Sequence, residues 1–139
     1  MVRPEVAGQK IARASARLEQ AEAILSRPRE EFASDPQARD LASFHLLLAI
    51  QEVIDLAAHW VADAGWPAPA DASSAFEVLA DHGVIERGLA EGLRGAAGLR
   101  NRIAHGYAGL DHGRLHDESR AGVATLRRFL VLVAEAGGL

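Results

Sequence analysis

The stretch Leu46-Leu-Leu-Ala-Ile-Gln-Glu-Val-Ile-Asp-Leu-Ala57 decides the fold of this 139-residue chain. A stripe of apolar side chains at helical spacing runs through it and beyond it on both sides: Leu41, Phe44, Leu47, Leu48, Val53, Ile54, Ala57 and Val61. A stripe this wide can contact two neighbouring helices at once, so we expect the central helix of a bundle. Polar residues interrupt the stretch, among them His45 and Gln51, and they favour a buried helix over a membrane span.

The ends of this central helix are marked in the sequence. Asp35 can cap its start, and Pro36 occupies the first helical position, where the missing N–H costs nothing. Its end is predicted near Ala64, because the following Gly65-Trp-Pro-Ala-Pro69 contains two prolines that cannot continue the hydrogen-bond ladder. Before it, the pattern from Gln9 to Phe32 predicts a first amphipathic helix with a proline in its last turn.

Three more helices are predicted after the proline-rich loop. Ser74-Ala-Phe-Glu77 matches the capping box, in which serine and glutamate satisfy free amides at a helix start, and Gly83 offers a left-handed stop. This third helix is short. A fourth should run from about Ile85 to His105, and the last from about Leu115 to Ala136.

The predicted fourth helix carries three glycines: Gly92, Gly95 and Gly98. Each costs roughly 1 kcal/mol relative to alanine inside a helix, so their spacing suggests a close approach by another backbone or by a ligand. A thin helix–helix contact is the simpler of these two interpretations.

Composition restricts the class of protein. Apolar residues make up 49% and aromatic residues 5% of the chain, which favours helices packed on helices through Ala, Leu, Val and Ile. We predict a single domain over residues 1–139, an all-α antiparallel bundle of about five helices with its core at about 9–135. The chain has no cysteine, which excludes a disulfide scaffold, a thiolate zinc site and a cysteine nucleophile. Without an apolar signal segment at its start, it is expected in the cytoplasm and not at a membrane.

Charge restricts where nucleic acid could bind. The net charge is formally −4, opposite to that of proteins that hold nucleic acid over a broad surface. Between Arg94 and Leu110, however, there are three arginines and no acidic residue. Any RNA site must therefore be local, and this segment is the candidate.

The segment contains Arg100-Asn-Arg-Ile-Ala-His-Gly-Tyr107. On an ideal helix the directions of Arg100 and His105 differ by about 140°, so the two residues cannot share one face. Asn101 lies four residues before His105 and is predicted to hydrogen-bond its imidazole, while Gly106 supplies a left-handed residue after the helix end. A histidine beside free helix-end carbonyls suits proton transfer, and the planar cation of Arg100 suits a phosphate.

These residue types are the parts needed to cleave RNA without a metal ion. The 2′-hydroxyl attacks the neighbouring phosphorus, a base removes its proton, an acid protonates the leaving oxygen, and a cation stabilises the phosphate. One chain offers one suitable histidine in this segment. A two-fold dimer would bring two copies of the helix end together, so we predict a homodimer with a composite site.

The spacing of Arg100, His105 and Tyr107 resembles the R-x4-H-x-Y motif of HepT-like toxins of the HEPN superfamily, in which a polar residue such as Asn101 usually follows the arginine. Two further segments resemble the family's central helix and the short helix before its motif: 46–57 and 75–80. The likeness covers about residues 9–135 and agrees with the all-helical fold expected above.

The resemblance implies the toxin of a toxin–antitoxin system, a small homodimer that cleaves RNA, either mRNA or tRNA, without metal or cofactor. It implies Arg100 and His105 as catalytic residues, Asn101 and Arg102 as supporting residues, and a minimal nucleotidyltransferase (MNT) as the cognate antitoxin. That transferase would attach AMP to Tyr107, and the added charge and bulk would compete with RNA phosphate for Arg100. The alternative is a non-catalytic HEPN module that binds a nucleotide or only the partner transferase.

The remaining histidines have competing interpretations. His112 and His116 have the four-residue spacing of two metal ligands on one helix face, but an exposed polar helix start is the simpler interpretation. Packing or surface roles are expected for the other three: His45, His59 and His82.

Two further pairs of residues are candidates for the site. Trp60 and Trp66 are expected to close the core at the proline-rich loop, with base stacking as the alternative. Glu52 and Asp55 on the central helix either assist the site or pair with arginines, and the sequence leaves both interpretations open.

Overall fold

The computed structural model describes residues 3–107 and 110–138, and every regular element in those ranges is helical. The elements are α1 (Pro4–Leu25), α2 (Arg29–Ala33), α3 (Pro36–Asp63), the 3-10 turn η1 (Ala72–Ser74), α4 (Ala75–Asp81), α5 (Arg87–Ala104) and α6 (His112–Ala136). The all-α bundle predicted from composition and periodicity is confirmed. The described part of the chain holds six α-helices and not about five, because the first predicted helix is divided in two.

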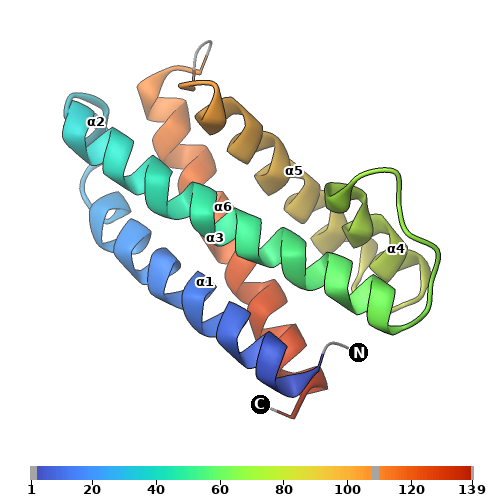
Figure 1. Ribbon diagram of the computed structural model, residues 1–139. Coiled ribbons are helices and arrows are strands. Elements are labelled where there is room, and N and C mark those ends of the chain that lie inside the picture. The colour runs from blue at the N-terminus through green and yellow to red at the C-terminus, as the bar shows by residue number, and fades with distance from the viewer. Residues whose placement is uncertain (1–2, 108–109, 139) are drawn as a thin grey trace.

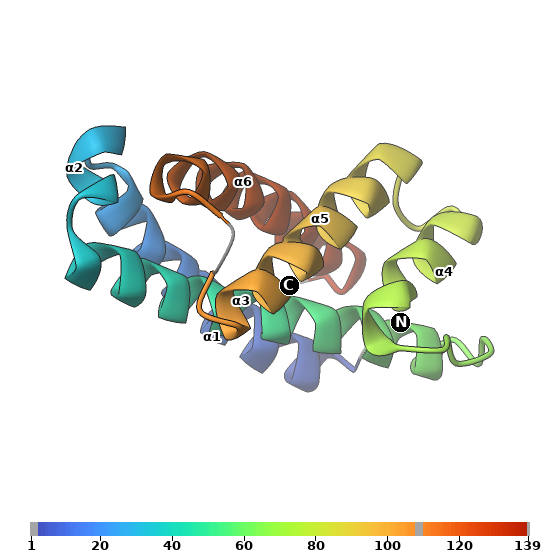
Figure 2. The same cartoon turned by 90° about the horizontal axis from the view of Figure 1, so that it is seen from above.

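Helix α3 runs through the middle of the bundle (Figure 1). It packs most extensively against α1 and also contacts α2, η1, α4, α5 and α6, which confirms the predicted central helix. Seen from above, α1 and α3 form one layer, and α5 and α6 lie over it as a second (Figure 2). The largest fully buried side chains are three phenylalanines: Phe32, Phe76 and Phe129.

The prediction of one helix from Gln9 to Phe32 is wrong, because the chain turns between α1 and α2. Pro28 precedes the first residue of α2, where its fixed φ and missing N–H are tolerated. The buried His116 of α6 places its ring Nε2 2.9 Å from the carbonyl oxygen of Leu25 and 3.0 Å from that of Arg27. Since both carbonyls can only accept, Nε2–H donates to them and satisfies the end of α1.

The two predicted helix caps have different outcomes. Asp35 accepts from the amides of Gln37 and Ala38, as predicted, and this hydrogen bonding lowers the pKa of its carboxyl, helped by the Arg27 guanidinium. The capping box at Ser74 is wrong. The Ser74 side chain makes no cap hydrogen bond to α4. Its hydroxyl and its amide both donate to Oδ1 of Asp71 at 3.1 Å, and Asp71 is the residue that caps the η1 turn.

Helix α3 is the one described helix that is long and apolar enough to cross a membrane. More than half of its apolar stretch is buried inside the bundle. The fully buried positions include Leu46, Ile50 and Ile54, each at most 1% exposed. Packing in the core therefore accounts for the apolar character of this helix.

The glycines of α5 make a close contact at only one position. A Cβ added at Gly92 would lie 3.1 Å from Cγ2 of Thr125 on α6, so the two helices approach closely there. A Cβ at Gly95 or Gly98 would meet nothing within 4 Å. The predicted thin helix–helix contact is thus confirmed at Gly92 and wrong for the other two.

Candidate active site at the end of helix α5

The motif segment ends α5 with a tight, fully hydrogen-bonded turn. The amide of Gly106 donates to the carbonyl of Ile103 at 2.8 Å, and that of Tyr107 donates to the carbonyl of Arg102 at 2.6 Å. This is the Schellman arrangement, with Gly106 at φ 79° as predicted. Tyr107 also has a left-handed backbone, at φ 44°, which is uncommon for a residue with a side chain.

Arg100 is half-buried and is oriented by two neutral amides. Its Nη1 donates to Oε1 of Gln51 on α3 at 3.1 Å, while its Nε and Nη2 donate to Oδ1 of Asn101 at 3.2 and 2.7 Å. The guanidinium plane is therefore fixed by partners on two helices. Because no charge opposes it in these contacts, the cation stays available to an anion.

The other three arginines of α5 are in a different situation, since each pairs with a carboxylate. Arg87 pairs with Asp81, Arg94 with Glu77 and Arg102 with Glu118. Arg100 has no carboxylate partner among the residues that the structure describes. It is thus the arginine of this helix whose charge is not already neutralised.

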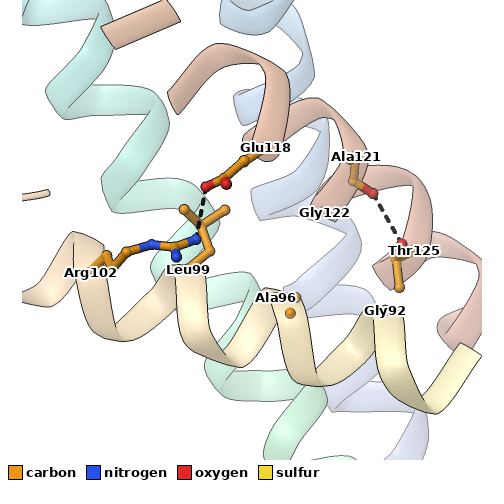
Figure 3. Close-up of a pocket in the computed structure, with 9 residues that line it drawn as sticks. Gly92, Ala96, Leu99, Arg102, Glu118, Ala121, Gly122 and Thr125 are labelled. Carbon is orange, nitrogen blue, oxygen red and sulfur yellow. Dashed lines mark hydrogen bonds and ion pairs between the residues drawn. The ribbon is translucent and has the colours of Figure 1, made fainter. Parts of the chain in front are cut away.

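Arg102 points away from Arg100, into a groove of about 250 Å³ between α5 and α6. Figure 3 shows its guanidinium beside Leu99, with a dashed line to Glu118 that marks a 2.8 Å hydrogen bond. The structure does not bring Arg102 to the side of α5 where Arg100 meets Gln51. Its supporting role at the same site therefore stays a prediction from the resemblance.

His105 is exposed and closes α5 as its C-terminal cap. Its backbone amide donates to the carbonyl of Asn101 at 3.2 Å. The predicted side-chain hydrogen bond between Asn101 and His105 is absent from the described residues, because the Asn101 oxygen faces Arg100 instead. Arg100 and His105 are likewise not joined, which agrees with their predicted divergence on the helix.

Tyr107 is half-buried against the first turns of α3. Its hydroxyl donates a hydrogen bond to Oδ1 of Asp40, and its ring meets His112 edge to face, with centroids 6.2 Å apart. Burial is the larger cause that raises the pKa of the tyrosine, and the hydrogen bond to Asp40 adds to it. The hydroxyl is therefore protonated at neutral pH and held in one direction.

The sequence pattern does not single out Asp40, and it marks Gln51 only as an interruption of the apolar stretch. The two residues are eleven apart, which on a helix differs by only about 20°, so they lie on one stripe of α3. That stripe supports both ends of the motif, through Arg100 at Gln51 and Tyr107 at Asp40. Two polar residues at this spacing on an otherwise apolar helix are the signal that could have identified them.

The histidines considered for a metal have separate environments. The exposed helix start expected for both is confirmed for His112, which contacts the ring of Tyr107, and wrong for His116, which is buried and bonded to the end of α1. No group of three or more potential ligands is found in the residues that the structure describes. The ring of His82 stacks on the indole of Trp66 with 3.8 Å between the ring centroids. The face of Trp66 that His82 covers is therefore not available to stack on a base.

Glu52 and Asp55 pair with cations of α1. Lys10 Nζ lies 3.5 Å from Glu52 and 3.7 Å from Asp55, and Nε of Arg13 lies 3.4 Å from Glu52. Of the two interpretations left open by the sequence, pairing is the one observed. Trp60 is 7% exposed, which confirms its expected place at the edge of the core.

The arrangement of the helices defines an all-α bundle of HEPN type. A tri-AMPylated HEPN toxin of Shewanella oneidensis, solved in complex with an MNT antitoxin, matches with a TM-score of 0.85 over 94% of this chain and 97% of that chain. A toxin–antitoxin structure with AMP-PNP matches with a TM-score of 0.86 over 94% and 98% of the two chains. Sequence identities are 20% and 19%, so this likeness establishes the fold.

The family follows from the sequence match. The family model described as ribonuclease HepT-like matches residues 14–133, and the chain belongs to this family. A predicted RNase of Archaeoglobus fulgidus is 38% identical over 68 residues, which are 49% of this chain and 51% of that protein. The chain thus spans about half the length of this curated relative.

Proposed function

We propose that the chain is the toxin of a HEPN–MNT toxin–antitoxin pair and acts as a metal-independent endoribonuclease. The observation that carries this proposal is the state of Arg100, which is fixed by the amides of Gln51 and Asn101 and paired with no carboxylate among the described residues. Its planar fork matches two oxygens of a phosphate. Membership of the HepT-like family and the match to an archaeal RNase support RNA as the source of that phosphate.

In the proposed reaction the 2′-oxygen bonds to the adjacent phosphorus while the bond from phosphorus to the leaving 5′-oxygen breaks. His105 of one protomer accepts the 2′-hydroxyl proton, and protonated His105 of the second protomer donates a proton to the leaving oxygen. Arg100 stabilises the negative charge on the non-bridging oxygens in the transition state. The products are a 2′,3′-cyclic phosphate and a 5′-hydroxyl, so no metal-bound water is required.

A two-fold dimer would supply the geometry that one chain lacks. Arg100 faces α3, while His105 is exposed beyond the end of α5. Beside Asp40, both Leu41 and Phe44 of α3 are 51% exposed. Burial of these two apolar side chains against a second copy would bring two helix ends together around one cleft.

The MNT partner would silence the enzyme by attaching AMP to Tyr107. The relative from Shewanella oneidensis is tri-AMPylated and was crystallised with an MNT antitoxin, which supports this proposal. The Tyr107 hydroxyl contacts Asp40 and Arg100 contacts Gln51, about 16 Å apart along one stripe of α3, so an attached AMP group would add bulk and negative charge on the face of α3 that the RNA has to reach. The modification would block the site without unfolding the bundle.

The decisive experiment incubates unmodified protein with single-stranded RNA in EDTA and separates the products. His105→Ala and Arg100→Gln should each lower the cleavage rate by about a hundredfold or more. Arg128→Gln, which changes an exposed arginine of α6, is the matched control and should cleave like the parent. Equal cleavage by all four proteins would assign the activity to a contaminant and refute the proposal.

The non-catalytic module is the second candidate, and the same experiment separates it from the first. The orientation of Arg100 by Gln51 supports this candidate, because the guanidinium could bind a nucleotide phosphate without His105 taking part. It requires nucleotide or partner binding that depends on Arg100, with no RNA turnover by the parent protein. Growth arrest on expression of the parent, relieved by His105→Ala, would rule it out.

A further inference from the structure

A groove lies between α1 and α3, next to the site. Its volume is about 480 Å³, and we call it the α1–α3 groove. The lining residues are Arg13, Ala16, Arg17, Gln20, Leu48, Gln51 and Glu52. The polar residues of α1 along it are four and three residues apart, so they line one face of the helix.

Gln51 connects this groove to the site. The same side chain that lines the groove accepts the 3.1 Å hydrogen bond from Nη1 of Arg100. The guanidinium of Arg100 therefore lies at the edge of the groove. A nucleotide chain with one phosphate at Arg100 would have its neighbouring nucleotides within reach of the α1 wall.

The charge of the groove suits an anionic chain. Its one lining carboxylate, Glu52, is already paired with Lys10 at 3.5 Å and with Arg13 at 3.4 Å. Arg17 has no carboxylate partner among the described residues. Its Nη1 donates to the ring of His45 at 3.1 Å, and its guanidinium lies 5.4 Å from the ring centroid of Phe44.

The positive charge of this groove is therefore local, in a chain whose formal net charge is −4. Arg17 on its α1 wall and Arg100 at its border have no carboxylate partner among the described residues, and Arg13 shares Glu52 with Lys10. Such a cluster attracts phosphates without making the whole surface cationic. The side-chain amides of Gln20 and Gln51 add donors and acceptors that ribose hydroxyls and base edges can use.

We propose that the α1–α3 groove binds the phosphate backbone of single-stranded RNA on one side of the bond cleaved at Arg100. The proposal deepens the ribonuclease function and rests on it. From Arg13 to Gln20 the wall extends about 10 Å along α1, which is enough for more than one nucleotide. A groove between two packed helices, whose axes are about 8–10 Å apart, suits a single strand and not a duplex.

The test measures RNA binding separately from cleavage. Fluorescence anisotropy of a labelled single-stranded RNA is recorded with His105→Ala protein, so that the RNA stays intact. Gln20→Glu adds one negative charge to the groove at nearly constant shape, and Gln20 has no hydrogen bond in the described structure that would be lost. The dissociation constant should rise about tenfold, the effect of losing one charge-assisted phosphate contact.

A second variant removes a cation and changes the salt dependence. Arg13→Gln takes away a side chain that is 60% exposed, and Lys10 remains as a partner of Glu52. The affinity should fall and the slope of log K against log salt should decrease by about 0.7, the value for one phosphate of a single strand. Arg128→Gln removes the same charge from α6 and should leave the slope unchanged.

The matched control for Gln20→Glu is Gln9→Glu, on the same helix and close to the same face. It lies eleven residues away, about 16 Å along the axis, which is twice the screening length of about 8 Å at physiological salt. If Gln20→Glu and Arg13→Gln bind RNA like their controls, the groove proposal is overturned even when the parent cleaves RNA. If the binding differences hold but the parent cleaves nothing, the ribonuclease function fails and the RNA-binding groove stands.

Discussion

Tyr107 donates its hydroxyl hydrogen bond to Asp40, and this contact joins the end of the motif to the first turns of α3. The two residues are 67 positions apart in the chain. The contact holds the phenol in one direction, on the stripe of α3 that also orients Arg100 through Gln51. The proposed modification site and the proposed phosphate site therefore lie along one face of α3.

The Tyr107–Asp40 contact can be tested by titration, because the chain has one tyrosine. Burial and Asp40 both raise the pKa of Tyr107, and the carboxylate favours the protonated phenol. Asp40→Asn should lower this pKa, because it removes the carboxylate while the lowering effect of the Arg39 guanidinium remains. Tyrosinate absorbance at alkaline pH measures the change directly. Glu135→Gln, an exposed change at the end of α6, should leave the titration as in the parent, and an unchanged titration in Asp40→Asn would disprove the contact.

The neutral partners of Arg100 can be converted into a charged one. Asn101→Asp keeps the size of the side chain but places a carboxylate where Nε and Nη2 of Arg100 donate. The resulting ion pair would compete with RNA phosphate, so we expect RNA cleavage to fall about tenfold or more. Asn101→Ala removes the acceptor without adding charge and should lower cleavage less. The same rate for both variants would show that the charge of Arg100 is not used.

The exposed apolar pair on α3 tests the composite site. Leu41→Glu places a charge on a residue that is 51% exposed, so folding should be little affected. If this face is the dimer interface, sedimentation should show a monomer, and RNA cleavage should be lost with it. The control is Val131→Glu, at a residue of α6 that is 57% exposed. This variant should keep the oligomeric state and the cleavage rate of the parent. A monomeric parent with full activity would contradict the composite site.

The elements predicted well from sequence are those decided locally. The Asp35 cap and the left-handed Gly106 depend on residues within a few positions, and both are confirmed. The division of the first helix depends on distant partners, since His116 satisfies the carbonyl of Leu25 from 91 positions away. Local periodicity contains no information about such a partner, so the prediction continued the helix through Pro28.

The same contrast between local signals and distant partners applies to the candidate site. The motif spacing predicts Arg100 and Tyr107 as site residues, and helical geometry predicts that Arg100 and His105 diverge. The partners that orient these side chains, Gln51 and Asp40, come from another helix. The local prediction for Asn101 was wrong because Arg100, its direct neighbour in the chain, offers two charged donors to the same oxygen.

The pair of half-buried Arg17 and buried His45 predicts a pH dependence of stability. Burial lowers the pKa of His45, and the Arg17 cation lowers it further. The unfolded chain therefore binds this proton more strongly, so the free energy of unfolding should be highest above pH of about 6.5 and fall as the pH drops towards the folded pKa. Urea unfolding between pH 7.5 and 5.5 measures the fall. It should be smaller in His45→Gln, which keeps an acceptor for Arg17, and unchanged in His59→Gln, an exposed histidine of α3.

Replacing the glycines of α5 by alanine should change the stability of the protein in opposite directions at different positions. Gly95→Ala and Gly98→Ala add a methyl group that meets nothing within 4 Å, so each should stabilise the protein by about 1 kcal/mol through helix propensity alone. Gly92→Ala gains the same propensity, but its methyl group would lie 3.1 Å from Thr125 and push α5 from α6. We expect this third variant to be neutral or destabilised in urea unfolding, and Gly92→Ala combined with Thr125→Ser to recover the gain, because the crowding Cγ2 is then absent. A gain at Gly92 as large as at Gly95 would show that the two helices do not approach closely there.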